Sequence, residues 1–174
     1  NVKSLGSQTL SPNGDWLAGI ISDGTARFDT DHFRFRDPSY LNLRTGEPVL
    51  INTATGDQAM MFKGKARITG MTWSKDGSKL IFMEQQGDKL VLGYYDTGSG
   101  KICYPKVKDE RILTINAGIQ VMNNENAVLV AVRANGWMDK AMAEYKEATE
   151  GPIVVYDGNK DFLKWDQIAV TASH

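Results

Sequence analysis

The chain has 174 residues, which allows one domain or one domain with a short appendage. Hydrophobic residues make up 41% and charged residues 24%, a mixture too apolar for a disordered chain, and no apolar run reaches the roughly 18–20 residues of a membrane span. Lys and Arg number 20 against 21 Asp and Glu, so the basic excess of a nucleic-acid binder or of a binder of anionic membranes is missing.

Short strand-like segments alternate with glycine-containing turns along the chain. Asn13-Gly14 and Asp76-Gly77 are typical of tight turns, because Gly adopts the positive φ angles that such turns need. In chain order, runs rich in Val, Ile, Leu, Tyr and Trp predict strands over residues 16–21, 49–52, 68–73, 79–84, 90–96, 119–122, 127–132 and 153–156. The chain is therefore predicted to be mostly β.

An amphipathic helix is predicted between residues 138 and 149. Lys140 and Glu144 have the spacing of an i,i+4 ion pair, and Gly151 and Pro152 end the helical pattern. Trp137, Ala141, Tyr145 and Ala148 recur at spacings of three and four, as do Met138 and Met142, so the helix has one apolar face. Its large side chains are Trp137, Met138, Met142 and Tyr145. We expect this face either to pack against a sheet edge or to form a domain-docking surface.

One sequence unit recurs along the chain. A strand end, an Asx-Gly turn and an apolar strand follow one another at residues 11–20 and again at 74–82, with a weaker copy at 122–130. After each copy comes a strand that ends in an Asn or Asp turn, at residues 50–56, 94–100 and 154–159. Gly56 and Gly100 are 44 residues apart, which lies within the roughly 40–45 residues of a four-stranded propeller blade.

The second copy carries a resemblance to a known repeat. Ser74-x-Asp76-Gly77-x-x-Leu80-x-Phe82, followed by Tyr94-x-Asp96-x-x-x-Gly100-Lys101, resembles the β-propeller repeat of TolB-type proteins. The same repeat builds the N-terminal propellers of the prolyl oligopeptidase family, including its dipeptidyl-peptidase-like and acylaminoacyl-peptidase-like members. The first copy departs from the pattern at Asn13 and Gly19, and the third has lost its glycine.

The resemblance implies an all-β fold. We expect one domain over residues 1–174, a partial β-propeller of about three four-stranded antiparallel blades with a short helical insertion. The blade-like units cover about 7–60, 66–104 and 115–172, with insertions at about 22–39 and 138–149. An unrelated β-meander or sandwich is the alternative. Propellers close with roughly four to eight blades, so we expect that the chain continues or that its insertions or a second copy cap the array. Because it begins with Asn1, we expect a piece of a longer protein.

No catalytic site is predicted in this chain. The nucleophile of an α/β-hydrolase lies in a Gly-x-Ser-x-Gly turn, and the nearest string, Gly98-Ser99-Gly100, has the wrong spacing. The chain has two histidines, His32 and His174, and the second is its last residue, a poor place to hold a catalytic base. The single cysteine, Cys103, excludes an internal disulfide and is predicted to be a thiol buried in a strand.

Metal, cofactor and nucleic-acid sites are not predicted either. Asp29, Asp31 and His32 could suit a divalent ion, but flanking arginines make a loop of solvated ion pairs the better interpretation. Residues 33–36 alternate aromatic with basic side chains, a pattern that any half-exposed strand also shows. No glycine-rich string matches a phosphate-binding loop, so no cofactor is expected.

The resemblance also implies a function. We expect the non-catalytic propeller portion of a prolyl-oligopeptidase-like serine peptidase, which restricts or orients peptide substrates for a hydrolase domain absent from this chain. Its partners would be the C-terminal α/β-hydrolase domain of the same polypeptide and a peptide substrate, with no nucleic acid and no membrane. The alternative is a TolB-like propeller acting as a protein-binding scaffold with no attached enzyme. Both interpretations imply a periplasmic or secreted protein of bacterial type.

Overall fold

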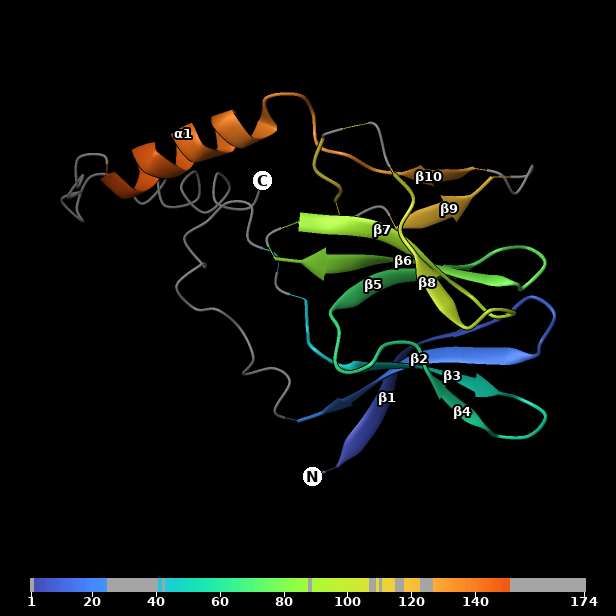
Figure 1. The fold of residues 1–174 in the computed structure, drawn as a ribbon. Coiled ribbons are helices and arrows are strands. Elements are labelled where there is room, and N and C mark those ends of the chain that lie inside the picture. Colours follow the sequence, from blue (N-terminus) through green and yellow to red (C-terminus); the bar gives the residue numbers. More distant parts are fainter. Residues whose placement is uncertain are drawn as a thin grey trace, which may run out of the picture.

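The computed structural model describes residues 2–24, 41, 43–87, 89–106, 109, 111–114, 118–122 and 127–150, the side chains as far as residue 147. Most of the predicted insertion at 22–39, the predicted strand at 153–156 and the end of the third unit lie outside the described residues. Within them the chain forms antiparallel sheets of four, four and two strands and one helix (Figure 1). The prediction of an all-β fold with a short helix is confirmed.

Each four-stranded sheet is a meander in which every strand pairs antiparallel with its neighbour in sequence. The first sheet consists of β1 (Lys3–Leu10), β2 (Trp16–Asp23), β3 (Glu47–Asn52) and β4 (Gln58–Met60). The second consists of β5 (Ile68–Trp73), β6 (Lys79–Gln86), β7 (Lys89–Asp96) and β8 (Lys101–Cys103). In these two sheets the predicted strands correspond to β2, β3, β5, β6 and β7, whereas β1, β4 and β8 were not predicted; the strands predicted at 119–122 and 127–132 are β9 and β10 of the third sheet.

The third unit contains two strands, followed by the helix. β9 (Ile119–Val121) pairs with β10 (Val128–Val130), and a further bridge joins Leu113 to Val132. The helix α1 (Trp137–Glu150) extends one residue beyond the predicted helix at each end. Lys140 Nζ and Glu144 Oε1 are 3.7 Å apart, so the predicted i,i+4 ion pair is present.

The core lies between the sheets, and β6 contributes to both of its halves. Leu80 and Phe82 face the first sheet, where they pack in one cluster with Ala18 and Leu50. The alternate residues Ile81 and Met83 face the third sheet, where they pack with Ile119 and Val130. Because side chains alternate along a strand, a strand that is covered on both faces is apolar throughout, as the run from Leu80 to Met83 is.

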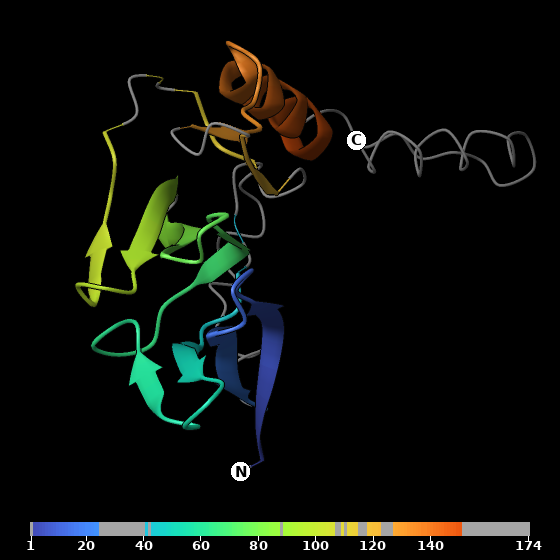
Figure 2. The same ribbon diagram turned by 90° about the vertical axis from the view of Figure 1, so that its right-hand side faces the viewer.

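The first strands of successive sheets lie next to one another, β1 beside β5 and β5 beside β9. The indole Nε1 of Trp73 donates a hydrogen bond of 3.3 Å to the carbonyl oxygen of Thr9, and a bridge between Gly46 and Ala66 joins the same two sheets. Figure 2 shows the three sheets following one another, with α1 beside the third. The sheets are thus the blades of a partial β-propeller, named blade 1 (β1–β4), blade 2 (β5–β8) and blade 3 (β9–β10) below.

The blades repeat each other residue by residue. In blade 1 the register of β1 against β2 shifts between Gly6 and Thr9, and in blade 2 that of β5 against β6 shifts between Thr69 and Thr72. Ser7 and Gly70 occupy the same place in these bulges and both have positive φ, 51° and 65°. Gly118, at φ 64°, is their counterpart in front of β9. The repeat inferred from the turns therefore extends to the backbone of the first strands.

Candidate functional site

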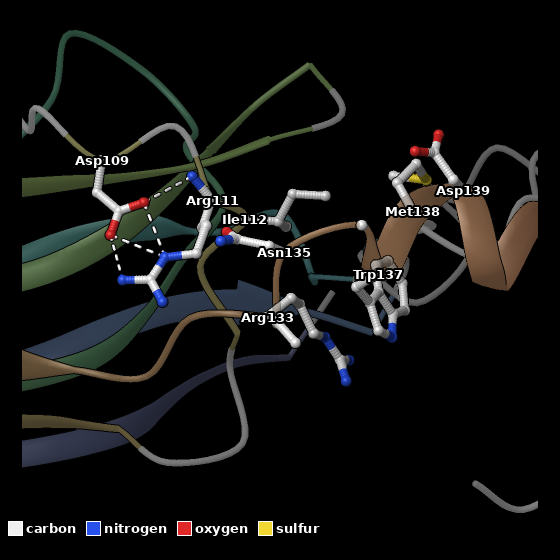
Figure 3. Close-up of a pocket in the computed structure, with 10 residues that line it drawn as sticks. Asp109, Arg111, Ile112, Arg133, Asn135, Trp137, Met138 and Asp139 are labelled. Atoms are coloured by element: carbon white, nitrogen blue, oxygen red, sulfur yellow. Dashed lines mark hydrogen bonds and ion pairs between the residues drawn. The ribbon is translucent and has the colours of Figure 1, made fainter.

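A hollow of about 360 Å³ lies beside the start of α1, between that helix and the segment around residues 109–112 (Figure 3). The backbone N–H of Arg133 donates a 2.8 Å hydrogen bond to the carbonyl of Ile112, which holds the two walls together. Gly136, at φ 72°, then turns the chain into the helix. The hollow is therefore built by blade 3 and the helix that follows it.

One wall of the hollow carries a salt bridge between Asp109 and Arg111. The guanidinium of Arg111 donates hydrogen bonds to both carboxylate oxygens of Asp109, with Nε 2.9 Å from each oxygen, and Nη2 also contacts the carboxylate (Figure 3). These bonds and the positive charge lower the pKa of Asp109 to about 2. Both groups are exposed to solvent, so the pair contributes little to the stability of the fold.

The other wall carries a cation–π contact between Arg133 and Trp137. The guanidinium carbon of Arg133 lies 4.5 Å from the ring centroid of Trp137, the distance of a cation–π contact (Figure 3). Both side chains are half-buried. Trp and Arg are the residue types most enriched in the energetic centres of protein interfaces, because they bring large area and directional donors. The wall has the chemistry of a protein-binding surface.

The four residues predicted as a docking surface are all on α1. Trp137 and Met138 line the hollow, so they join the site that Arg133 and the ion pair form. Met142, one turn further along, has 46% of its surface exposed, and Tyr145 is half-buried. The prediction that these four share one helix is confirmed, and their role in docking stays a prediction. Asp109, Arg111 and Arg133 were missed, although the spacing of four between Arg133 and Trp137 was a usable signal.

The nearest match to a nucleophile turn in the sequence has a structural role. Ser99 lies in the turn between β7 and β8, where its N–H and its hydroxyl both donate 2.8 Å hydrogen bonds to Asp96 Oδ1, so it stabilises a turn. The candidates Asp29, Asp31 and His32 lie outside the described residues, as do Phe33–Arg36 and His174. Among the described residues no group of three or more His, Cys, Asp or Glu could hold a metal ion. No helix in this part of the chain is long and apolar enough to cross a membrane.

Cys103 lies in a strand, as predicted, but it is half-buried rather than buried. The reason is its place in β8, the last strand of blade 2, which among the residues that the structure describes has a paired neighbour on one edge only. Cys103 stands opposite Tyr94 of β7 and accepts its hydroxyl hydrogen bond, which raises the pKa of Tyr94.

The predicted Asx-Gly turns are present, and both blades build them in the same way. Ser74 Oγ donates a 2.6 Å hydrogen bond to Asp76 Oδ1 and accepts one of 2.9 Å from Lys79 N. The Ser78 N–H and hydroxyl add two more bonds to the Asp76 carboxylate, at 3.0 and 2.7 Å. In blade 1, Ser11 and Asn13 repeat the first of these bonds at 2.7 Å. The hydroxyl and backbone donors hold the pKa of Asp76 well below its usual range.

Replacing Asp76 with asparagine is expected to make the thermal midpoint less sensitive to acid. A carboxyl whose folded pKa is depressed adds stability above its unfolded pKa of 3.8, and this stability is lost as the pH falls below that value. The asparagine would copy Asn13 of blade 1 and keep one acceptor, but it would not titrate. Thermal melts of the wild type and Asp76→Asn from about pH 5 downward measure the difference in slope. Equal slopes would mean that Asp76 is not a source of the acid sensitivity.

No protein-family model matches the chain, and no curated protein matches it. Among solved structures the fold is similar to the crystal structure of TolB from Acinetobacter baumannii, with a TM-score of 0.50 and 18% sequence identity. The similarity covers 75% of this chain and 27% of that chain, so this chain spans about a quarter of the structure it matches. At this identity the likeness shows the fold alone, and it agrees with the partial propeller expected from the repeat.

Proposed function

We propose that this chain is a non-catalytic β-propeller scaffold that binds another protein domain through the start of α1. One combination of features carries the proposal. The guanidinium of Arg133 lies over the ring of Trp137 at the start of α1, and Met142, further along the same helix, is exposed. Apolar groups clustered on a surface and next to a hollow mark a contact surface. The binding surface is defined here as Arg133, Trp137, Met138, Met142 and Tyr145.

The resemblance of blade 2 supports a more specific form of the proposal. In that form the partner is the C-terminal α/β-hydrolase domain of a prolyl-oligopeptidase-like serine peptidase, and the propeller restricts or orients its peptide substrates. A TolB-like scaffold with no attached enzyme is the second form, and the similarity to the TolB structure favours a scaffold. Both forms place the protein in the periplasm or outside the cell.

The downstream coding sequence separates the two forms. The peptidase form requires a following stretch that contains Gly-x-Ser-x-Gly, then an Asp and then a His, in the chain order of an α/β-hydrolase triad. The scaffold form requires that no such domain follows. Because the sequence has no Gly-x-Ser-x-Gly turn, this chain alone is expected to hydrolyse no peptide reporter in either form.

Replacing Met138 and Met142 together with serine is expected to leave the thermal midpoint of the chain nearly unchanged. Met142 has 46% of its surface exposed and Met138 is half-buried beside the open hollow, so neither belongs to the buried core and both contribute little to the stability of the isolated chain. If the two were core residues, the double change would cost several kcal/mol, about 2–5 for each methionine. Differential scanning calorimetry distinguishes these outcomes, and a large drop in the midpoint would end the docking proposal.

The matched control for this change is on the opposite side of the same helix. Lys140→Ser with Glu144→Ser removes two long side chains at the same spacing and breaks their exposed ion pair. Where a hydrolase domain follows, its binding to the propeller, measured by titration calorimetry with the separated domain, should weaken for the methionine pair and stay unchanged for the charged pair. Equal effects of the two pairs would assign the result to helix stability rather than to docking.

A further inference from the structure

Two arginines and two aspartates line the hollow beside the start of α1. Asp109 and Arg111 neutralise each other in the salt bridge of one wall. Asp139 lies in the first turn of the helix, where the partial positive charge of the helix start stabilises a carboxylate, and it points away from Arg133 (Figure 3). Among the residues that the structure describes, Arg133 is therefore the one cation of the hollow without a carboxylate partner.

The guanidinium of Arg133 is held in place, but its N–H groups have no protein acceptor in the part of the chain that the structure describes. Its contact with the ring of Trp137 at 4.5 Å uses its positive charge and supplies no lone pair for a hydrogen bond. A guanidinium has N–H donors in a planar fork that fits the two oxygens of a carboxylate. Because Arg133 is half-buried, salt screens an ion pair formed there less than a pair on an open surface. The residue is thus arranged to receive an anion.

We propose that the domain bound at α1 inserts one Asp or Glu side chain into this hollow, where the carboxylate accepts two hydrogen bonds from Arg133. The contact rests on the proposed function, since it needs a domain bound at this surface, and it names the chemical group that the surface recognises. One unpaired positive charge matches one carboxylate, and the guanidinium fork matches its two oxygens. Trp137 holds the guanidinium in position beforehand, which lowers the entropy that binding costs.

The rest of the lining favours a carboxylate over other anions. A phosphate group carries about two negative charges at pH 7. The second charge would lie near Asp109 and Asp139, and the lining residues offer no further unpaired cation for it. The apolar lining residues Ile112 and Met138, together with the ring of Trp137, favour apolar side chains next to the acidic one. The ligand that fits is therefore an acidic residue within an apolar segment of a protein.

Two capped peptides that differ in one group test the proposal on the full chain. Acetyl-Leu-Glu-Leu-amide presents a carboxylate between apolar side chains, and acetyl-Leu-Gln-Leu-amide presents an uncharged amide of the same shape. NMR titration follows the Nε–H signal of Arg133 and the indole Nε1–H signal of Trp137. Both signals should shift with the glutamate peptide, with a dissociation constant about tenfold lower than for the glutamine peptide, because hydrogen bonds to an ionised acceptor are the stronger ones. Inorganic phosphate should bind more weakly than the glutamate peptide.

Three variants assign the binding to the guanidinium. Arg133→Gln should reduce the affinity for the glutamate peptide to that for the glutamine peptide, and Arg133→Lys, which keeps the charge but not the fork, should give an intermediate affinity. Lys140→Gln is the matched control, because it removes an exposed cation from the same helix, and it should leave the affinity unchanged. Circular dichroism melts check that the variants are folded, and Arg133→Lys decides alone if Arg133→Gln is not.

Equal affinities for the two peptides would overturn the carboxylate contact, as would Arg133 variants that bind the glutamate peptide as tightly as the wild type does. Tighter binding of phosphate than of the glutamate peptide, or no shift of either signal, would overturn it too. The proposed function fails on a different result, the large drop in the thermal midpoint of the methionine pair. A surface that binds both peptides equally would therefore keep its docking role and lose only the acidic partner.

Discussion

Replacing Phe82 with alanine is expected to lower the free energy of unfolding by about 3–5 kcal/mol. Phe82 has no exposed surface, and its ring meets that of Phe62 edge-to-face at a centroid distance of 5.7 Å. Its cross-strand neighbour Gly93 has no side chain, so the ring lies directly against the backbone of β7. A Cβ on residue 93 would be 3.0 Å from the ring of Phe82. Alanine would leave a void between blades 1 and 2 that the paired strands around it cannot fill.

Chemical denaturation followed by tryptophan fluorescence measures this loss. Met142→Ala is the matched control, because it also shortens a large apolar side chain but at an exposed helical position, and it should change the free energy by at most about 0.5 kcal/mol. A loss below about 1 kcal/mol for Phe82→Ala would mean that the two blades do not share the core described here.

The counterpart of Phe82 in blade 1 is Gly19, which the sequence pattern marked as a departure from the repeat. The structure gives the reason. Leu5 of β1 covers Gly19 so closely that a Cβ there would be 2.6 Å from Leu5 Cδ1. An aromatic ring is needed in blade 2 to fill the space toward blade 1, whereas on blade 1 a leucine from its own first strand fills that position. The departure is a packing compensation, not a failure of the repeat.

Strands were predicted well where burial alone determines the residue types. The bounds of β5 were predicted to the residue, and the centre of β6 was found because both of its faces are buried. β1 was missed because its side chains are mainly exposed and its residues include Gly6 and Ser7 at the bulge. The strands β4 (Gln-Ala-Met) and β8 (Lys-Ile-Cys) are as short as β9 and β10, which were predicted, but they lack the Val and Ile content of those two strands, and they form because a neighbour offers an edge.

The candidate site was predicted in part for a similar reason. The apolar face of α1 follows from a local period of three and four, which the sequence displays directly. The contribution of Asp109 and Arg111 depends on how the segment before β9 returns to the start of the helix. That return is fixed by the bridge between Leu113 and Val132, a tertiary contact with no signature in the sequence. Local periodicity thus identified the helical part of the candidate site, and the tertiary topology added Asp109 and Arg111 to the lining of the hollow.

The two Asx-Gly turns look interchangeable in the sequence, but alanine is expected to cost more at Gly77 than at Gly14. Both glycines have positive φ, 72° and 80°, so alanine at either position carries a strain of about 1–2 kcal/mol. The space around them differs. A Cβ at Gly14 would meet nothing within 4 Å, whereas a Cβ at Gly77 would be 2.7 Å from Asn13 Oδ1.

The side chain of Asn13 cannot move aside without loss. Its Oδ1 accepts a 2.7 Å hydrogen bond from Ser11 Oγ, and its Nδ2 donates one of 2.8 Å to Asp15 Oδ2. Gly77→Ala should therefore add about 1–3 kcal/mol of overpacking to the strain that it shares with Gly14→Ala. Removing the obstacle in Asn13→Ala should shrink the difference between the two glycine variants, which a double-mutant cycle by chemical denaturation measures. Equal losses for the two glycine variants would mean that the turns of blades 1 and 2 do not touch. The contact between these turns is what makes one copy of the repeat constrain the next.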